Sequence, residues 1–174
     1  MKVTWFGNTA FRLHIGGKII AIEPERASAG VDVNEMVSAA DHVLALDENR
    51  PVADAASWKP RGRERLLDAG EGTRPVQFWS MGASSLLVDA DEDMPLLLLA
   101  GPVPVLGRWA DRTVVILVGN ALAERAAEVI GRVAPRLIGL AGEEAEIEAA
   151  FVALRDRLDG TGLVALERGM AVEV

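Results

Sequence analysis

The chain has 174 residues and a net charge of −8 at pH 7; 50% of its residues are hydrophobic and 25% are charged. This length and balance predict a single globular domain, residues 1–174, with enough apolar side chains for a sizeable core. The negative charge argues against nucleic acid as a partner, because contacts to phosphates need clustered Lys and Arg. The sequence has no Cys, which excludes disulfides and thiolate metal ligands.

No targeting or membrane-spanning segment is recognisable in the sequence. Its apolar runs fall short of the ~18 residues that a spanning helix needs. The N-terminus lacks the basic start, apolar stretch and cleavage site of a secretion signal. We therefore expect a cytoplasmic protein without a membrane partner.

The first 24 residues predict the opening of an antiparallel sheet. Residues 3–5 and 11–15 alternate between apolar and polar side chains, the period-2 pattern of half-buried strands. Gly16 and Gly17 supply the positive-φ positions of a tight hairpin turn, and residues 18–23 form the returning strand.

The rest of the chain predicts further strands and helices, which place it in the α/β (α+β) class. Expected strands are residues 41–46 (buried), 76–79, 84–89, 94–100, 113–118 and 136–140, followed by a final strand pair at 162–167 and 170–174. Expected helices are residues 33–39, 53–58, 121–133 with Asn120 as N-cap, and 143–158 with Ile147, Phe151, Leu154 and Leu158 facing inward. Residues 61–72 are expected to form a charged connection, and residues 91–93 a solvated turn.

Two short motifs carry a family resemblance. They are Trp5-Phe6-Gly7-Asn8-Thr9-Ala10-Phe11 and Ile22-Glu23-Pro24. They resemble the openings of metallo-β-lactamase-fold hydrolases, in the branch similar to sugar-phosphate lactonases. The resemblance implies a four-layer αββα sandwich of the metallo-β-lactamase type, here truncated.

The metal ligands of that family are replaced in this chain. The resembled site uses about five His and bridging carboxylates, whereas this sequence has only two His. The resemblance places these residues where the family has ligands: Asn8, Glu23, Asp47, Asn49, Pro51, Val52, Pro102 and Ala141. We therefore expect no catalytic residue and no cofactor, and predict a scaffold that is used for binding or assembly.

Two alternatives remain open at this point. A hydrolase with a reduced metal site would use Glu23, Asp47 and Asn49, whose oxygen atoms suit Mg²⁺ or Ca²⁺; otherwise residues 47–49 are simply a polar loop.

Asn8, together with Trp58, Trp79 and Trp109, marks a possible pocket, where the three Trp would either fill the former site or line a small-molecule or dimer surface. Apolar edges left exposed by the truncation would favour a homodimer. The sequence does not identify the small-molecule ligand.

Overall fold

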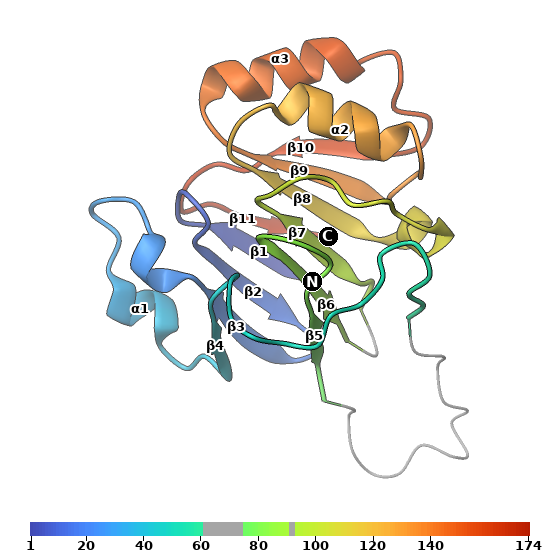
Figure 1. The fold of residues 1–174 in the computed structure, drawn as a ribbon. Helices are drawn as coiled ribbons and strands as arrows, with labels where there is room; N and C mark the ends of the chain where they lie inside the picture. Colours follow the sequence, from blue (N-terminus) through green and yellow to red (C-terminus); the bar gives the residue numbers. More distant parts are fainter. Residues whose placement is uncertain (61–74, 91–92) are drawn as a thin grey trace.

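The structure, a computed structural model, describes residues 1–60, 75–90 and 93–174, and these residues form two mixed β-sheets with three α-helices (Figure 1). The five-stranded sheet has the order β11-β1-β2-β3-β4 and the six-stranded sheet the order β10-β9-β8-β7-β6-β5. The strands of the first sheet are β1 (Lys2–Trp5), β2 (Phe11–Ile15), β3 (Lys18–Ile22), β4 (His42–Leu44) and β11 (Ala171–Glu173). Those of the second are β5 (Gln77–Trp79), β6 (Ser85–Asp89), β7 (Leu96–Leu99), β8 (Val114–Val118), β9 (Leu137–Ala141) and β10 (Gly162–Ala165).

The helices are α1 (Val33–Val37), α2 (Leu122–Ile130) and α3 (Glu144–Leu154), with short 3₁₀ turns at η1 (Pro24–Arg26) and η2 (Arg108–Arg112). The mixed α/β class predicted from the sequence is confirmed. The opening hairpin is also confirmed: β2 and β3 pair antiparallel, and Gly16 and Gly17 have φ values of 56° and 70°.

The main core lies between the two sheets, and a second core lies between the six-stranded sheet and its helices. Along β7, Leu96 and Leu98 face the first core, whereas Leu97 and Leu99 face the second. The residues of β8 divide between the two cores in the same way. These strands are apolar without interruption because both faces of their sheet are covered.

The helices pack on the outer faces of the two sheets (Figure 1). α2 and α3 lie side by side over the six-stranded sheet, and they bury Leu122, Ala126 and Val129 of α2 and Ala150 and Leu154 of α3. The five-residue α1 lies against the other sheet, where Arg12 donates to the carbonyl oxygens of Glu35, Met36 and Ser38 at 2.9 Å each. The guanidinium thus satisfies carbonyls that a helix leaves unpaired at its C-terminus.

Two predicted elements differ before residue 60. The strand at residues 41–46 is not buried: it shortens to β4, an edge strand of the described sheet, and Val43 is 54% exposed. Residues 53–58 form turns instead of a helix: the carbonyl oxygen of Asp54 accepts from Ser57 N at 3.2 Å and Trp58 N at 2.9 Å, which closes a single turn before Pro60. The Asp54 carboxylate accepts from Ser57 Oγ at 2.6 Å and Ala56 N at 3.1 Å, and these hydrogen bonds lower the pKa of Asp54.

The C-terminal helices also begin and pack differently from the prediction. Asn120 is not the N-cap of α2; that position is Ala121 in the left-handed conformation, and Glu146 of α3 accepts from Leu122 N at 3.1 Å. α3 ends at Leu154, and Phe151 is 40% exposed because Ala150 and Leu154 form the buried face instead. The two final strands are not a pair: β10 joins β9 and β11 joins β1, in different sheets.

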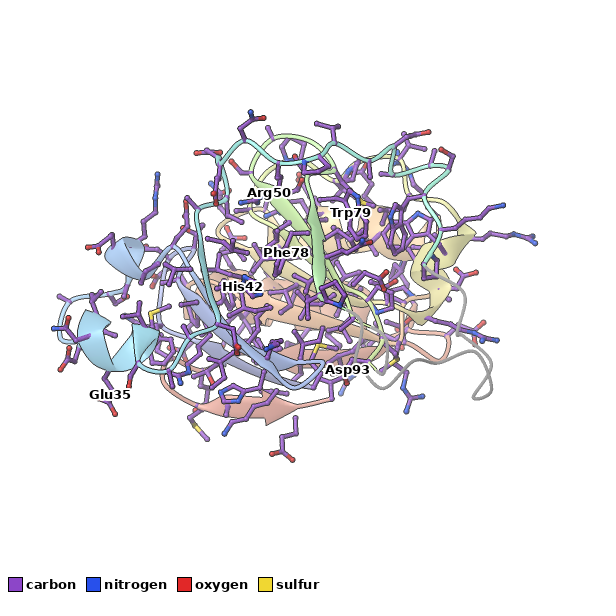
Figure 2. The ribbon with its side chains drawn as sticks, turned by 90° about the horizontal axis from the view of Figure 1, so that it is seen from below. Glu35, His42, Arg50, Phe78, Trp79 and Asp93 are labelled. Atoms are coloured by element: carbon purple, nitrogen blue, oxygen red, sulfur yellow. The ribbon has the colours of Figure 1, made fainter. Side chains whose placement is uncertain are left out.

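One edge of the sandwich is joined by an aromatic contact. His42 of β4 lies edge-to-face against Phe78 of β5, with ring centroids 5.1 Å apart (Figure 2).

Two large apolar side chains, Val43 near this edge and Val52, are exposed. The homodimer stays a prediction, and these two side chains are available to its interface.

The remaining expectations concern the connection at 61–72, the turn at 91–93 and membrane-spanning segments. The charged connection at 61–72 and most of the turn at 91–93 lie outside the described residues. Among the residues that the structure does describe, no helix is both long and apolar enough to cross a membrane.

Candidate functional site

A cavity of about 600 Å³ lies at the carboxyl ends of the parallel strands β7, β8 and β9. Its lining comprises Trp5, Gly7, Asn8, Ser28, Ala100, Val118, Gly119, Asn120, Ala141, Gly142, Glu143, Glu146 and Arg168. Ligands commonly bind at this end of parallel strands, where successive loops converge and can be varied without disturbing the sheet. The volume lies within the range typical of small-molecule sites.

The loop between β1 and β2 forms one wall of this cavity. Trp5 Nε1 donates to the carbonyl oxygen of Asn8 at 2.9 Å, and Asn8 Nδ2 donates to the carbonyl oxygen of Arg26 at 3.0 Å. Gly7 has a φ of 95°, and a Cβ built there would lie 1.8 Å from Ser28 Oγ. The chain passes so close to Ser28 that only glycine fits, and Asn8 serves to hold the wall together.

Glu23, a candidate metal ligand, is instead occupied by protein groups. Its side chain is buried, and Oε1 accepts from Leu46 N at 3.3 Å. Oε2 accepts from the Thr9 hydroxyl and lies 3.3 Å from Arg26 Nε. The carboxylate thus connects three segments of the chain, and it is not part of the cavity lining.

Asp47 and Asn49 lie on an exposed loop after β4. Asp47 Oδ1 accepts from Ser84 Oγ at 3.5 Å, at the limit of a hydrogen bond. Across residues 1–60, 75–90 and 93–174, no three His, Cys, Asp or Glu side chains come together as a metal site would require. Of the three proposed ligands, Glu23 is already engaged by protein groups, and Asp47 and Asn49 are exposed to solvent.

The three candidate Trp residues come together, but apart from Asn8. Trp58 contacts Trp79 and Trp109 edge-to-face, with ring centroids 5.6 Å and 4.7 Å apart. Trp109 Nε1 donates to the carbonyl oxygen of Ala55 at 2.6 Å. The cluster packs against the second core, and none of its rings lines the cavity beside Asn8.

Arg125 of α2 supports the opposite wall of the cavity from behind. One terminal nitrogen donates to the carbonyl oxygens of Leu99 and Gly101 at 2.7 Å each, at the end of β7. The other donates to Val118 at 2.8 Å and Asn120 at 3.4 Å, at the end of β8. Burial lowers the pKa of Arg125 from its usual value. A single guanidinium thus fixes two of the loops that line the cavity.

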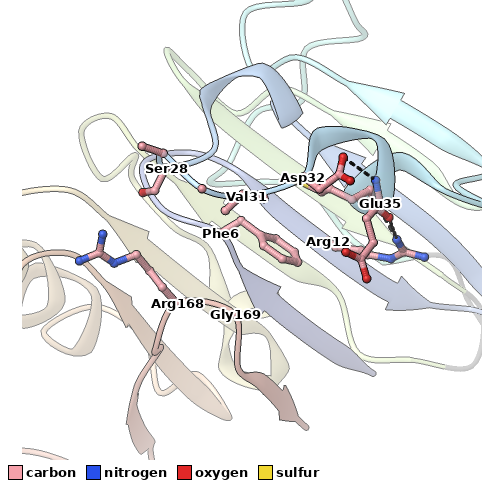
Figure 3. Close-up of a pocket in the computed structure, with 11 residues that line it drawn as sticks. Phe6, Arg12, Ser28, Val31, Asp32, Glu35, Arg168 and Gly169 are labelled. Atoms are coloured by element: carbon pink, nitrogen blue, oxygen red, sulfur yellow. Dashed lines mark hydrogen bonds between the residues drawn. The ribbon is translucent and has the colours of Figure 1, made fainter.

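A second cavity, of about 650 Å³, adjoins the first (Figure 3). It lies between the segment around α1 and the loop after β10, and Ser28 and Arg168 line both cavities. Figure 3 shows Phe6 between Arg168 and the α1 end of this space, where Asp32 caps the helix by accepting from Asn34 N at 2.9 Å. The two cavities therefore meet at Ser28 and Arg168.

Comparison of the chain with protein-family models, curated proteins and solved structures finds no match in any of the three. The resemblance to metallo-β-lactamase-fold hydrolases therefore rests on the chain's own residues.

Sequence reasoning missed most of the polar lining of the first cavity. Asn120 and Glu143 follow directly after β8 and β9, so the rule that ligands bind at the carboxyl ends of parallel strands would have found them. Ser28 follows η1 and Arg168 lies between β10 and β11, and no local pattern marks either residue as part of a site.

Proposed function

We propose that this chain is a non-catalytic scaffold, with a truncated four-layer αββα sandwich of the metallo-β-lactamase type, that binds a small molecule in the first cavity. The observation that carries this proposal is the position of Asn8 and Ala141, which the resemblance assigns to lost metal ligands. They come from opposite halves of the chain and line the same cavity. On this resemblance, two of the eight former ligand positions belong to the proposed binding site.

The arrangement of layers supports the fold part of the proposal. Two mixed sheets face each other across a shared core, with α1 outside one sheet and α2 and α3 outside the other. α1 has only five residues, in keeping with a truncated outer layer.

The chemistry of the lining supports binding over hydrolysis. Metal-dependent hydrolysis needs ligands that leave an open coordination position for an activated water. Here Asn8 holds a loop, Ala141 has no polar side chain, and Glu23 is engaged outside the cavity. What remains is an open pocket with fixed walls and a lining of both polar and apolar residues.

A bulky side chain at Asn120 is expected to block binding. Asn120 is exposed and lines the cavity, so Asn120→Trp fills the space without replacing a buried residue. The measurement is a thermal-shift screen with a panel of amino acids, organic acids, amines, sugars and nucleotides. A probe at one hundred times its dissociation constant should raise the melting temperature of the wild type by about 5–10 °C, and that of the variant by much less.

Asn34→Trp is the matched control, because it makes the same change at an exposed position of α1 that lies outside the cavity. It should respond to the same probes as the wild type. An Asn120→Trp protein that binds as well as the wild type would place the ligand elsewhere, and a panel without any shift would also count against the proposal.

The alternative hydrolase with ligands Glu23, Asp47 and Asn49 makes a different prediction about metal content. We expect purified protein to contain no stoichiometric Mg, Mn, Ca or Zn by elemental analysis, because Glu23 is already satisfied by protein groups. Addition of these ions should leave the melting temperature unchanged. Stoichiometric metal that disappears in Asp47→Ala would establish the alternative instead.

A further inference from the structure

We propose that the ligand of the first cavity is a small zwitterion of the amino-acid type, with its carboxylate bound by Arg168 and its ammonium group by Glu143 and Glu146. This inference rests on the proposed function and specifies its ligand. The inference is based on the charged side chains of the cavity. Among the described residues that line it, these are Arg168, Glu143 and Glu146.

Arg168 has a fixed backbone and a free charged end. Its loop is tied to both sheets: Leu166 N donates to the carbonyl oxygen of Leu140, and Gly169 N to that of Trp5, each at 2.8 Å. Within the described part of the chain, the guanidinium forms no ion pair or side-chain hydrogen bond, and the residue is exposed. An arginine positioned in this way can bind a carboxylate through two parallel hydrogen bonds.

The carboxylates lie at the start of α3 and keep acceptor capacity. Glu146 is half-buried, and its Oε2 accepts from Leu122 N at 3.1 Å, which holds the group at the cavity wall. Glu143 is exposed, and its side chain does not cap the helix that it precedes. Two carboxylates at one wall favour a cationic group and disfavour a purely anionic ligand.

The decisive feature is that these opposite charges share a cavity without neutralising each other. No nitrogen of Arg168 lies within 4.0 Å of a carboxylate oxygen of Glu143 or Glu146 among the described ion pairs. A simple cation would leave Arg168 unmatched, and a simple anion would face both carboxylates. A molecule with both charges satisfies the whole lining, and charge complementarity of this kind provides specificity.

The experiment compares matched probes by isothermal titration calorimetry. Each of a set of amino acids is titrated beside its N-acetyl derivative, which lacks the ammonium charge, and its amide, which lacks the carboxylate. We expect at least one free amino acid to bind, and each derivative to bind about tenfold or more weakly, the effect of losing one charge-assisted contact.

Two variants assign the charges. In Arg168→Met the preference for the acid over the amide should disappear, and in Glu143→Gln the preference for the free amine over the N-acetyl form should shrink. Arg157→Met is the control, since Arg157 is also exposed but lies outside the cavity; its affinities should match the wild type.

The outcomes separate this inference from the proposed function. If the amide or the N-acetyl derivative binds as tightly as the free amino acid, or if Arg168→Met keeps the preference for the acid, the zwitterion is wrong. The same holds if only a probe of another class binds. Asn120→Trp would then still report whether that other probe occupies the cavity.

Discussion

Arg125→Met is expected to lower the free energy of unfolding by about 2–4 kcal/mol. The change removes hydrogen bonds to four carbonyl oxygens at the ends of β7 and β8. Hydrogen bonds from a charged donor stabilise a fold by about 1.5–3 kcal/mol each, and water can replace part of this where the site is not fully buried. Urea denaturation measures the difference, which corresponds to a drop in melting temperature of roughly 5–15 °C.

The control for this prediction, Arg132, lies two residues beyond the end of α2. Arg132 forms an exposed ion pair with Glu128 at 2.9 Å and one hydrogen bond to the carbonyl oxygen of Pro104 at 3.2 Å. Arg132→Met should therefore lower the unfolding free energy by less than about 1 kcal/mol. Equal losses in the two variants would contradict the role assigned to Arg125.

Glu23→Ala is expected to lower the free energy of unfolding by about 2–3 kcal/mol. The substitution leaves the N–H of buried Leu46 without its acceptor and removes the contacts to Thr9 and Arg26. An unsatisfied buried donor alone accounts for about 1–3 kcal/mol. The measurement is again urea denaturation, combined with elemental analysis of both proteins.

The elemental analysis decides between structure and metal binding as the role of Glu23. Glu25→Ala is the matched control, because Glu25 lies in the same 3₁₀ turn and is exposed; we expect it to retain wild-type stability. If Glu23→Ala kept full stability but lost a bound metal ion, the reduced metal site would be correct and the structural role wrong.

Local sequence pattern predicted elements whose stability depends on near neighbours or on general burial. The hairpin around Gly16 and Gly17 needs only positive-φ residues between two alternating strands. The apolar runs that became β7 and β8 are long enough and apolar enough to indicate strands covered on both faces. Both signals lie within a few residues, so tertiary context was not needed to interpret them.

Three of the errors concern how helices begin, continue and pack, which the pattern of apolar residues does not determine. Asp54 caps a single turn that ends before Pro60, so the expected helix does not continue. Asn120 does not cap α2, because the N–H of Leu122 donates instead to Glu146, which lies 24 positions further along the chain. Phe151 lost its inward position because α3 packs through Ala150 and Leu154, which bring the helix closer to its neighbours.

Some features of the candidate site could be predicted from the sequence, and others depend on the tertiary structure. The sequence by itself excluded thiolate ligands and a five-histidine metal cluster, because those conclusions need only the count of residue types. It also picked out Asn8, through a motif of adjacent residues. Only the tertiary structure separated Asn8 from the three Trp residues and joined it to Asn120, Glu143 and Arg168 in one cavity. The physical reason is that a cavity is formed where loops from both sheets meet, and the positions of those loops depend on how the sheets pack.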